Sequence, residues 1–166
     1  MHAGQNMSTK YIISFMQLTI YTDYSLRVLI YLGAHPDRRV TINEIAESYG
    51  ISRNHLVKVV NQLSQKGWIT TIRGKHGGMH LAFPPEQINI GMVIRQTEPH
   101  MNLLECFDKE NNTCSISPAC TLKRVLYQAR RAFMEVLDQH TLADVLGPHA
   151  GDIIQILERT RIENRR

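Results

Sequence analysis

The chain has 166 residues, is 43% apolar and carries a formal net charge of +4. This length accommodates one compact domain, or a small domain with an oligomerising arm, and excludes two large domains. The excess positive charge lies in residues 52–80, which contain five basic residues and no carboxylate, as is typical of an element that binds nucleic acid.

The first 15 residues, "MHAGQNMSTKYIISF", lack the basic region and the apolar core of a signal peptide. No apolar run elsewhere approaches the roughly 20 residues that a membrane-spanning helix needs. We therefore expect a cytoplasmic protein without a membrane partner. We interpret residues 1–15 as an N-terminal extension that is disordered, because strong helical patterning begins only after Met16.

The next three segments predict a helix-turn-helix preceded by a buried helix. Residues 22–36 place apolar side chains at helical spacing and end at a proline. Residues 40–50 contain a capping box formed by Thr41 and Glu44 and end on a glycine. Residues 51–67 follow at once as a second short amphipathic helix. Two short helices joined by a tight turn that contains glycine form a helix-turn-helix.

A β-hairpin is predicted to follow the second of these helices. Residues 68–82, "WITTIRGKHGGMHLA", alternate bulky and polar side chains on both sides of a glycine-rich tip. One more short helix ends before Pro99. The predicted fold is therefore mainly α with a small β-hairpin wing, and we assign residues 16–99 to a winged helix-turn-helix domain.

The helix and the wing both supply candidate DNA-binding side chains. The start of the second helix faces base edges in the major groove of a helix-turn-helix complex, and arginine and asparagine can read guanine and adenine there. In this chain the helix residues are Ser52, which is also the expected N-cap, Arg53, Asn54, His55 and Lys58. The wing contributes Arg73, Lys75 and His76 beside glycines that let the backbone approach phosphates.

Two other interpretations of this basic segment are weaker. The polar side chains could form a solvated helix face, but the coincidence of charge with a thin glycine-rich wing favours DNA binding. The wing tip also resembles a phosphate-binding loop superficially. It lacks the G-x-x-x-x-G-K-[ST] motif and does not lead into a helix, so we do not expect a nucleotide site.

A loop at residues 100–120 contains all three cysteines, Cys106, Cys114 and Cys120, spaced C-x7-C-x5-C. An odd cysteine number in a chain without a secretion signal argues against a disulfide framework. Incidental cysteines would scatter along the chain. Structural zinc usually pairs its thiolates more closely, whereas iron-sulfur clusters accept wider spacing. The spacing therefore favours an iron-sulfur cluster modestly over zinc.

A long amphipathic helix is predicted to begin at Ser117 and Pro118, and it continues with a following short helix to residue 146. Its apolar stripe requires a partner, and we expect a homodimer in which this helix packs against its symmetry mate. The stripe consists of Leu122, Val125, Leu126, Ala129, Phe133, Val136 and Leu137. For residues 147–166 we expect a C-terminal tail with a final helical turn or two.

Taken together, "MQLTIYTDYSLRVLIYL", "ISRNHLVKVVNQLSQKGWITTIRGKHGG", "CSISPAC" and "FMEVLDQHTLADVL" resemble the IscR/NsrR family of winged-helix regulators, and most closely its nitric-oxide-sensing iron-sulfur repressors. The resemblance extends from Met16 to about Leu146. It implies a homodimer that holds one cluster per subunit on the three cysteines. It also implies that the dimer binds a double-stranded DNA operator and releases it when nitric oxide destroys the cluster.

The resemblance carries further expectations about the metal site. A 4Fe-4S cluster is favoured over 2Fe-2S, and Asp23 is expected to reach the cluster of the opposite subunit as the fourth ligand. His100 is a weaker alternative for that ligand. IscR-type members carry a histidine three residues after the last cysteine, where this chain has Lys123, so IscR-type ligation is not expected. Dimer symmetry further implies a pseudo-palindromic operator.

The functional hypothesis is thus a cluster-gated transcriptional repressor. The alternative is a winged-helix regulator that contains structural zinc or responds to another redox or iron signal. We do not expect an enzyme, because the chain has neither a C-x-x-C motif nor an obvious cofactor loop, and a redox enzyme would leave the basic helix and wing unexplained.

Overall fold

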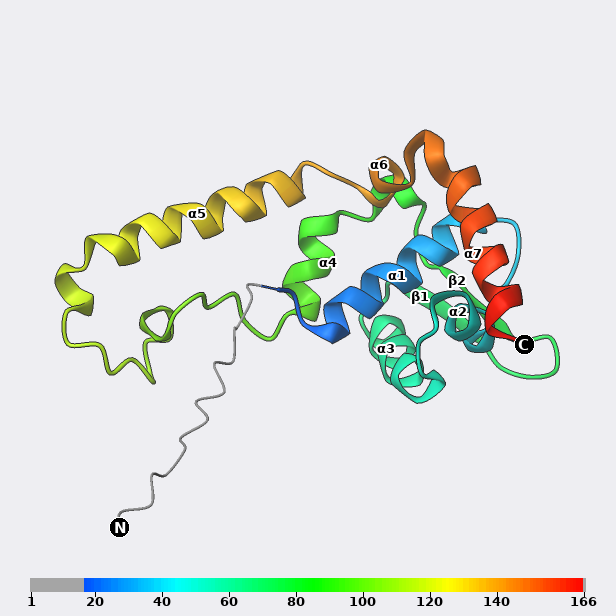
Figure 1. The fold of residues 1–166 in the computed structure, drawn as a ribbon, viewed down its shortest axis with the longest axis horizontal. Coiled ribbons are helices and arrows are strands. Elements are labelled where there is room, and N and C mark those ends of the chain that lie inside the picture. Colours follow the sequence, from blue (N-terminus) through cyan, green and yellow to red (C-terminus); the bar gives the residue numbers. More distant parts are fainter. Residues whose placement is uncertain (1–16, 166) are drawn as a thin grey trace, which may run out of the picture.

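Helix α1 (Ile20–Ala34) runs through the middle of the body of the molecule, and its side chains form the centre of the core (Figure 1). Val28, Leu29 and Leu32 are each at most 2% exposed. The computed structural model describes residues 17–165, and the expected disordered extension at residues 1–15 lies outside them. The helix begins at its N-cap Thr19, whose hydroxyl accepts a hydrogen bond from a backbone amide of the first turn.

The other elements agree with the predicted fold class, a mainly helical chain with a small hairpin. They are α2 (Ile42–Tyr49), α3 (Arg53–Gln65), β1 (Ile69–Ile72), β2 (Gly78–Leu81), α4 (Ile90–Thr97), α5 (Thr121–Asp138), α6 (Leu142–Leu146) and α7 (Ala150–Asn164). Four short 3-10 turns connect them in the described part of the chain. Figure 1 shows α5 and the cysteine-containing loop extending away from the body that the remaining elements form.

The predicted helix-turn-helix is confirmed in α2 and α3. The Thr41 hydroxyl accepts the Glu44 amide hydrogen at 3.3 Å, while Glu44 Oε2 accepts that of Thr41 at 2.6 Å, which completes the capping box. Gly50 has a φ of 63°, a left-handed conformation that favours glycine, and it ends α2. Leu56 and Leu63 are fully buried and fix the inner face of α3 against the core.

The wing is an antiparallel hairpin of β1 and β2, with Ile72 opposite Gly78. The strands are also attached to the segment before α2, because Val40 and Met79 exchange two backbone hydrogen bonds of 3.0 and 2.8 Å. The sequence pattern did not predict this bridge. It ties β2 of the wing to the segment that leads into the helix-turn-helix.

The C-terminal end of α5 is fixed to α4 by polar contacts. Arg95 Nη2 donates to Asp138 Oδ2 at 2.6 Å, and Asn89 Nδ2 donates to the Asp138 carbonyl oxygen at 2.7 Å. Gly91 faces the same aspartate so closely that an added Cβ would overlap the Asp138 side chain. This joint sets the direction in which α5 leaves the body.

We predict that Gly91→Ala loosens this joint. The new methyl group would collide with Asp138, and overpacking of this kind costs about 1–3 kcal/mol. A lower midpoint of thermal unfolding would support this. Gly151→Ala in α7 is the matched control, since nothing lies within 4 Å of its added Cβ, and it should be neutral or slightly stabilising. Equal midpoints for Gly91→Ala and the parent chain would contradict the prediction.

The structure corrects two boundaries at the ends of the long helix. The predicted helix start at Ser117 is wrong, because residues Ser117–Ala119 form a 3-10 turn and α5 begins at Thr121 with Cys120 as its N-cap. Pro118 is the second residue of this short turn rather than the first residue of the long helix. The predicted tail at residues 147–166 is also wrong in form, since α7 is a 15-residue helix there.

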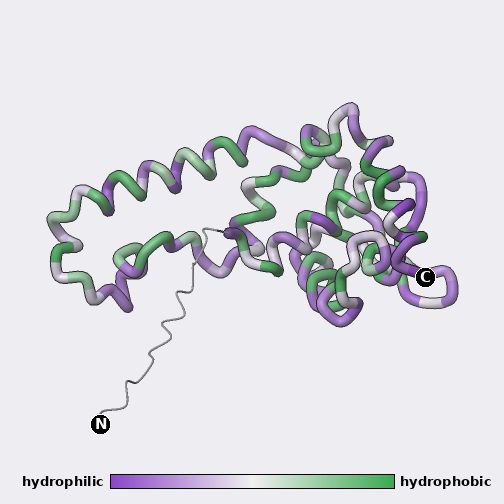
Figure 2. The backbone as a smooth tube through the Cα atoms, in the orientation of Figure 1, coloured by the Kyte–Doolittle hydropathy of each residue, from purple (hydrophilic) through white to green (hydrophobic). Residues whose placement is uncertain are grey.

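Most of the predicted apolar stripe on α5 is exposed in the single chain. Leu122 is 58% and Val136 57% exposed, and Val125 and Phe133 are exposed as well. In Figure 2 the tube of α5 alternates between hydrophobic and hydrophilic residues, as an amphipathic helix does. No helix within residues 17–165 is long and apolar enough to cross a membrane.

Candidate functional site

The start of α3 is open to solvent along the face that the sequence predicts to read DNA. The buried residues of α3 lie on its opposite face and hold the helix against the core. The exposed residues are Ser52, Arg53, Asn54, His55 and Lys58. Ser52 occupies the N-cap position as expected, but its side chain makes no capping hydrogen bond to any described residue. Its hydroxyl is thus available to a ligand.

Arg53 is oriented by the other helix of the motif. Its Nε donates to Asn43 Oδ1 of α2 at 2.9 Å. Arg53 and Asn43 border an open groove of about 310 Å³ between the helix-turn-helix and the wing. The groove reaches the glycines of the wing, Gly74, Gly77 and Gly78. The arginine is therefore presented on a polar surface where a base edge or a phosphate can approach.

The wing tip brings Arg73, Lys75 and His76 together as exposed side chains. Gly74, with a φ of 108°, permits the turn between them. Sequence reasoning missed Arg39, whose Nη1 donates to the His76 carbonyl oxygen at 3.2 Å and which is itself exposed. The available signal was that Arg39 follows Arg38 directly in the sequence "PDRRV". Acidic residues nearby offset the positive charge of this segment when its net charge is counted.

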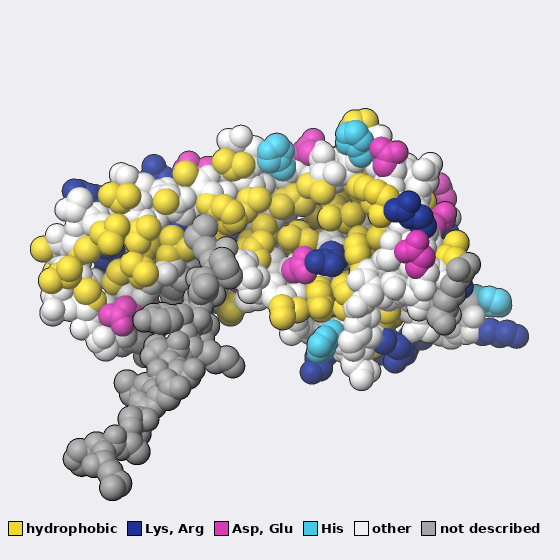
Figure 3. All heavy atoms as spheres, viewed as in Figure 1, with side chains coloured by type: hydrophobic (Ala, Val, Ile, Leu, Met, Phe, Trp, Pro, Cys, Tyr) yellow, Lys and Arg dark blue, Asp and Glu magenta, His cyan; other side chains and the backbone are white. Residues whose placement is uncertain are grey.

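Figure 3 shows lysine and arginine side chains along the side of the body where α3 and the wing lie. Hydrophobic side chains gather over α5 and the cysteine loop, at the other end of the molecule, and continue over the middle of the body. The predicted DNA-binding residues therefore share one side of the body, and the apolar stripe lies well separated from them.

The cysteines lie on the loop that connects α4 to α5, and none is in a disulfide among the described residues. Cys106 is 7% exposed and sits in the 3-10 turn Glu105–Phe107. Cys114 is half-buried. The Cys120 sulfur is the N-cap of α5 and accepts the Lys123 amide hydrogen at 3.5 Å.

The side chains around Cys120 border an open hollow of about 530 Å³. Lys123 contributes to its wall and donates from Nζ to Ser117 Oγ at 2.8 Å. The lysine at the position where IscR-type members have a histidine is thus a hydrogen-bond donor to the loop. It does not add a metal ligand.

Three free thiols on one loop fit the chemistry of an iron-sulfur group, which is held by cysteine thiolates. Their arrangement is less complete. Within residues 17–165, no three histidine, cysteine or acidic side chains are grouped closely enough to hold a metal ion. The single chain therefore supplies the donor types on one loop but does not gather them into a finished site.

An aromatic stack that sequence reasoning missed attaches this loop to α5. Phe107 and Tyr127 are parallel, with ring centroids 4.2 Å apart, and the Arg130 guanidinium lies 5.0 and 4.7 Å from the two centroids. Arg130 Nη1 also donates to the Met101 carbonyl oxygen at 3.4 Å. Because Phe107 follows Cys106 directly, the stack holds that cysteine against the helix.

Asp23 and His100 are the predicted fourth ligand and its alternative, and both make other contacts in the single chain. Asp23 is in the first turn of α1, where its carboxylate forms an ion pair of 2.9 Å with Arg27 and is 45% exposed. The His100 ring accepts the Asn102 amide hydrogen at 3.4 Å. Neither belongs to a metal-binding group of described residues.

Known proteins match this chain over most of its length. Residues 18–148 match the family model of Rrf2, described as an iron-dependent transcriptional regulator. The HTH-type transcriptional regulator NsrR of Bacillus subtilis is 51% identical over 144 residues, which cover 86% of this chain and 98% of that protein. NsrR of Bacillus licheniformis is 54% identical over 132 residues, 79% of this chain and 92% of the relative.

Solved structures give the same answer for the fold. CymR, the global cysteine regulator of B. subtilis, has a TM-score of 0.64 and 29% identity, covering 79% of this chain and 96% of its own. IscR of T. potens has a TM-score of 0.62 and 27% identity, covering 79% and 86%. From the family match and the close relatives we conclude that the chain belongs to the Rrf2 family of transcriptional regulators.

Proposed function

We propose that the protein is a cytoplasmic, homodimeric repressor whose affinity for DNA depends on an iron-sulfur cluster and falls in response to nitric oxide. Cys106, Cys114 and Cys120 would hold the cluster, with Asp23 of the opposite protomer as fourth ligand, and we favour 4Fe-4S over 2Fe-2S. When bound, the cluster supplies iron that reacts with nitric oxide. The choice of signal and of cluster type follows from the family resemblance of the sequence, and two regulators named NsrR are 51% and 54% identical to this chain.

One observation carries the proposal: the loop with the three free thiols runs directly into α5, whose apolar stripe is exposed. Cys120 caps that helix, and the aromatic stack holds the turn of Cys106 against it. A change at the thiols would therefore alter the position of the helix that is expected to pair the two protomers. Since dimer geometry sets the distance between the two reading helices, the loop is well placed to control operator binding.

The first test is a spectrum of protein purified without air. Straw-brown protein with visible absorbance that fades on addition of nitric oxide, together with loss of binding to a duplex selected from random sequence by the parent protein, would support the proposal. Colourless protein with zinc bound, and DNA binding indifferent to nitric oxide, would favour the alternative of a winged-helix regulator with structural metal.

We predict that Arg53→Ala and Lys75→Ala weaken DNA binding in different ways. Arg53 is proposed to read a base, so its loss should cost about 1–3 kcal/mol on the selected duplex and alter base preference. Lys75 at the wing tip is proposed to contact a phosphate, so its loss should weaken all duplexes and flatten the dependence of affinity on salt. Binding isotherms at several salt concentrations distinguish these effects, and parent-like affinity in both variants would reject the assignment.

A further inference from the structure

Helix α7 packs along α2, the first helix of the helix-turn-helix (Figure 1). Leu157 of α7 is 5% exposed and belongs to the core, with Ile153 and Ile154 packed against it. The Rrf2 family model matches residues 18–148 and so ends before α7 begins at Ala150. The helix is therefore an integral part of this fold outside the matched range.

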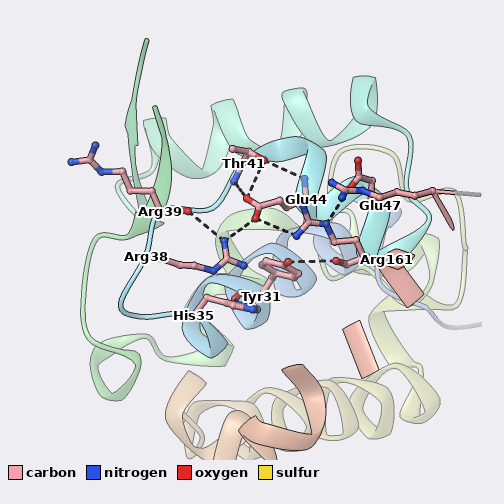
Figure 4. Close-up of polar contacts among 10 residues, drawn as sticks. Tyr31, His35, Arg38, Arg39, Thr41, Glu44, Glu47 and Arg161 are labelled. Carbon is pink, nitrogen blue, oxygen red and sulfur yellow. Dashed lines mark hydrogen bonds and ion pairs between the residues drawn. The ribbon is translucent and has the colours of Figure 1, made fainter. Parts of the chain in front are cut away.

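The polar side of α7 meets two carboxylates of α2. Arg161 donates from Nε to Glu47 Oε2 at 3.0 Å and from Nη1 to Glu44 Oε1 at 3.3 Å. Arg165 Nε donates to the same Glu47 oxygen at 2.8 Å, and Asn164 Nδ2 donates to the Glu47 carbonyl oxygen at 2.7 Å. Figure 4 shows Arg161 within this network beside both carboxylates.

These contacts are less exposed than ordinary surface ion pairs. The Arg161 side chain is 23% exposed, and that of Glu44 is 15% exposed. Partly buried pairs are screened less by salt than surface pairs, which contribute little on average. Hydrogen bonds from Arg165 and Arg161 lower the pKa of Glu47, so its carboxylate is charged at neutral pH. The Arg161 contacts are therefore able to influence how α2 is held.

The network reaches both ends of α2. At the first turn, Glu44 also accepts the Thr41 amide hydrogen and a hydrogen bond of 2.8 Å from Arg38 Nη1, so α7 is linked to the capping box. At the other end, Asn164 Nδ2 lies 3.8 Å from the position of a Cβ on Gly50, the residue that ends α2 before α3. In a helix-turn-helix, α2 crosses the DNA backbone and determines how α3 enters the groove.

We propose that α7 braces the helix-turn-helix for DNA reading, with Arg161 and Arg165 as positioning residues that fix α2 and thereby the orientation of α3. This inference rests on the proposed role of α3. Neither arginine needs to touch DNA for this positioning role.

The experiment compares the full-length parent with Arg161→Ala, Arg161→Lys and Arg159→Ala. Arg159 is the control, because it is exposed on the same helix and has no hydrogen bond or ion pair with any described residue. Affinity is measured for a duplex that the parent selects from random sequence and for an unrelated duplex, each at several salt concentrations. Far-UV circular dichroism and thermal unfolding monitor the fold.

For a brace, Arg161→Ala should bind the selected duplex roughly tenfold more weakly, while the unrelated duplex and the salt dependence stay as in the parent. Arg161→Lys should recover part of the loss, and Arg159→Ala should match the parent. Should Arg161→Ala unfold, Arg165→Ala provides the same readout with a smaller loss, since its side chain is 55% exposed and leaves the apolar packing intact.

Two results would overturn the brace. Unchanged affinity for the selected duplex in folded variants would reduce the contacts to a stabilising role. Equal losses on both duplexes with a flatter salt dependence would mean that Arg161 contacts phosphate directly. Failure of the DNA role itself gives a different result, because the parent protein would then enrich no duplex from the random pool.

Discussion

Alanine at any one of Cys106, Cys114 and Cys120 is expected to give a colourless protein that binds its operator weakly. Each thiolate is a proposed cluster ligand, and metal affinity in such a site depends on the full ligand set. Loss of the cluster should free the loop that runs into α5. Coupling between two sites is commonly 5- to 150-fold in affinity, and we expect a loss of roughly this size.

Ser115→Ala is the control for these variants, because Ser115 is an exposed residue of the same loop without a sulfur. It should keep both the visible absorbance and the operator affinity of the parent. Anaerobic absorbance and binding isotherms with and without nitric oxide give the comparison. Cysteine variants that bind tightly and ignore nitric oxide would show that the thiols do not control DNA binding.

The same measurements address Asp23. Since Asp23 pairs with Arg27 in the structure, Asp23→Ala removes both an ion pair and the proposed ligand, whereas Arg27→Ala removes only the ion pair. An exposed pair of this kind at i,i+4 is worth about 0.3–0.5 kcal/mol. A spectrum altered in Asp23→Ala but not in Arg27→Ala would identify the carboxylate as a ligand. Identical spectra in both would leave Asp23 a helix-start residue.

The helix-turn-helix was predictable because its signals are local. The reciprocal hydrogen bonds of Thr41 and Glu44 and the left-handed conformation of Gly50 depend on residues a few positions apart, and the structure shows both. The exposed start of α3 and the wing tip follow from the same short-range pattern. The fold class and the placement of the candidate DNA-binding residues on one side of the body could therefore be predicted from the sequence.

What the sequence did not reveal depends on contacts between distant residues. Arg161 meets Glu47 across 114 positions, and Arg39 meets His76 across 37, so neither pair has a periodicity or a motif. The stack of Phe107 on Tyr127 is similar, since it joins a loop to a helix. For α7, the apolar spacing indicated only a helical turn or two, because much of the stability of this 15-residue helix comes from packing on α2.

The boundary error at α5 has a physical cause of another kind. Serine followed by proline is a good start for any helix, including the short 3-10 turn Ser117–Ala119 that precedes α5. The actual N-cap is Cys120, a residue that is not among the usual caps. Its sulfur caps the helix by accepting the Lys123 amide hydrogen.

Val125→Glu is expected to separate the proposed dimer into monomers. Val125 lies on the apolar stripe of α5 and is 51% exposed in the single chain. A charge buried without a partner costs roughly 3–5 kcal/mol, and twofold symmetry places the substitution in the interface twice. The dissociation constant of the dimer should therefore rise by at least about 100-fold.

Sedimentation or light scattering reports the mass, and a duplex with one or two half-sites reports the consequence for DNA. Gln128→Glu adds the same charge to an exposed residue off the stripe and should remain dimeric. Monomeric Val125→Glu should bind one half-site as the parent domain does but lose the extra affinity for two half-sites spaced about one or two turns apart, at ~34 Å per turn. A Val125→Glu protein that stays dimeric would place the interface elsewhere. The cysteine loop could then not set the distance between the two reading helices through α5. The cluster would have to control DNA binding within one protomer.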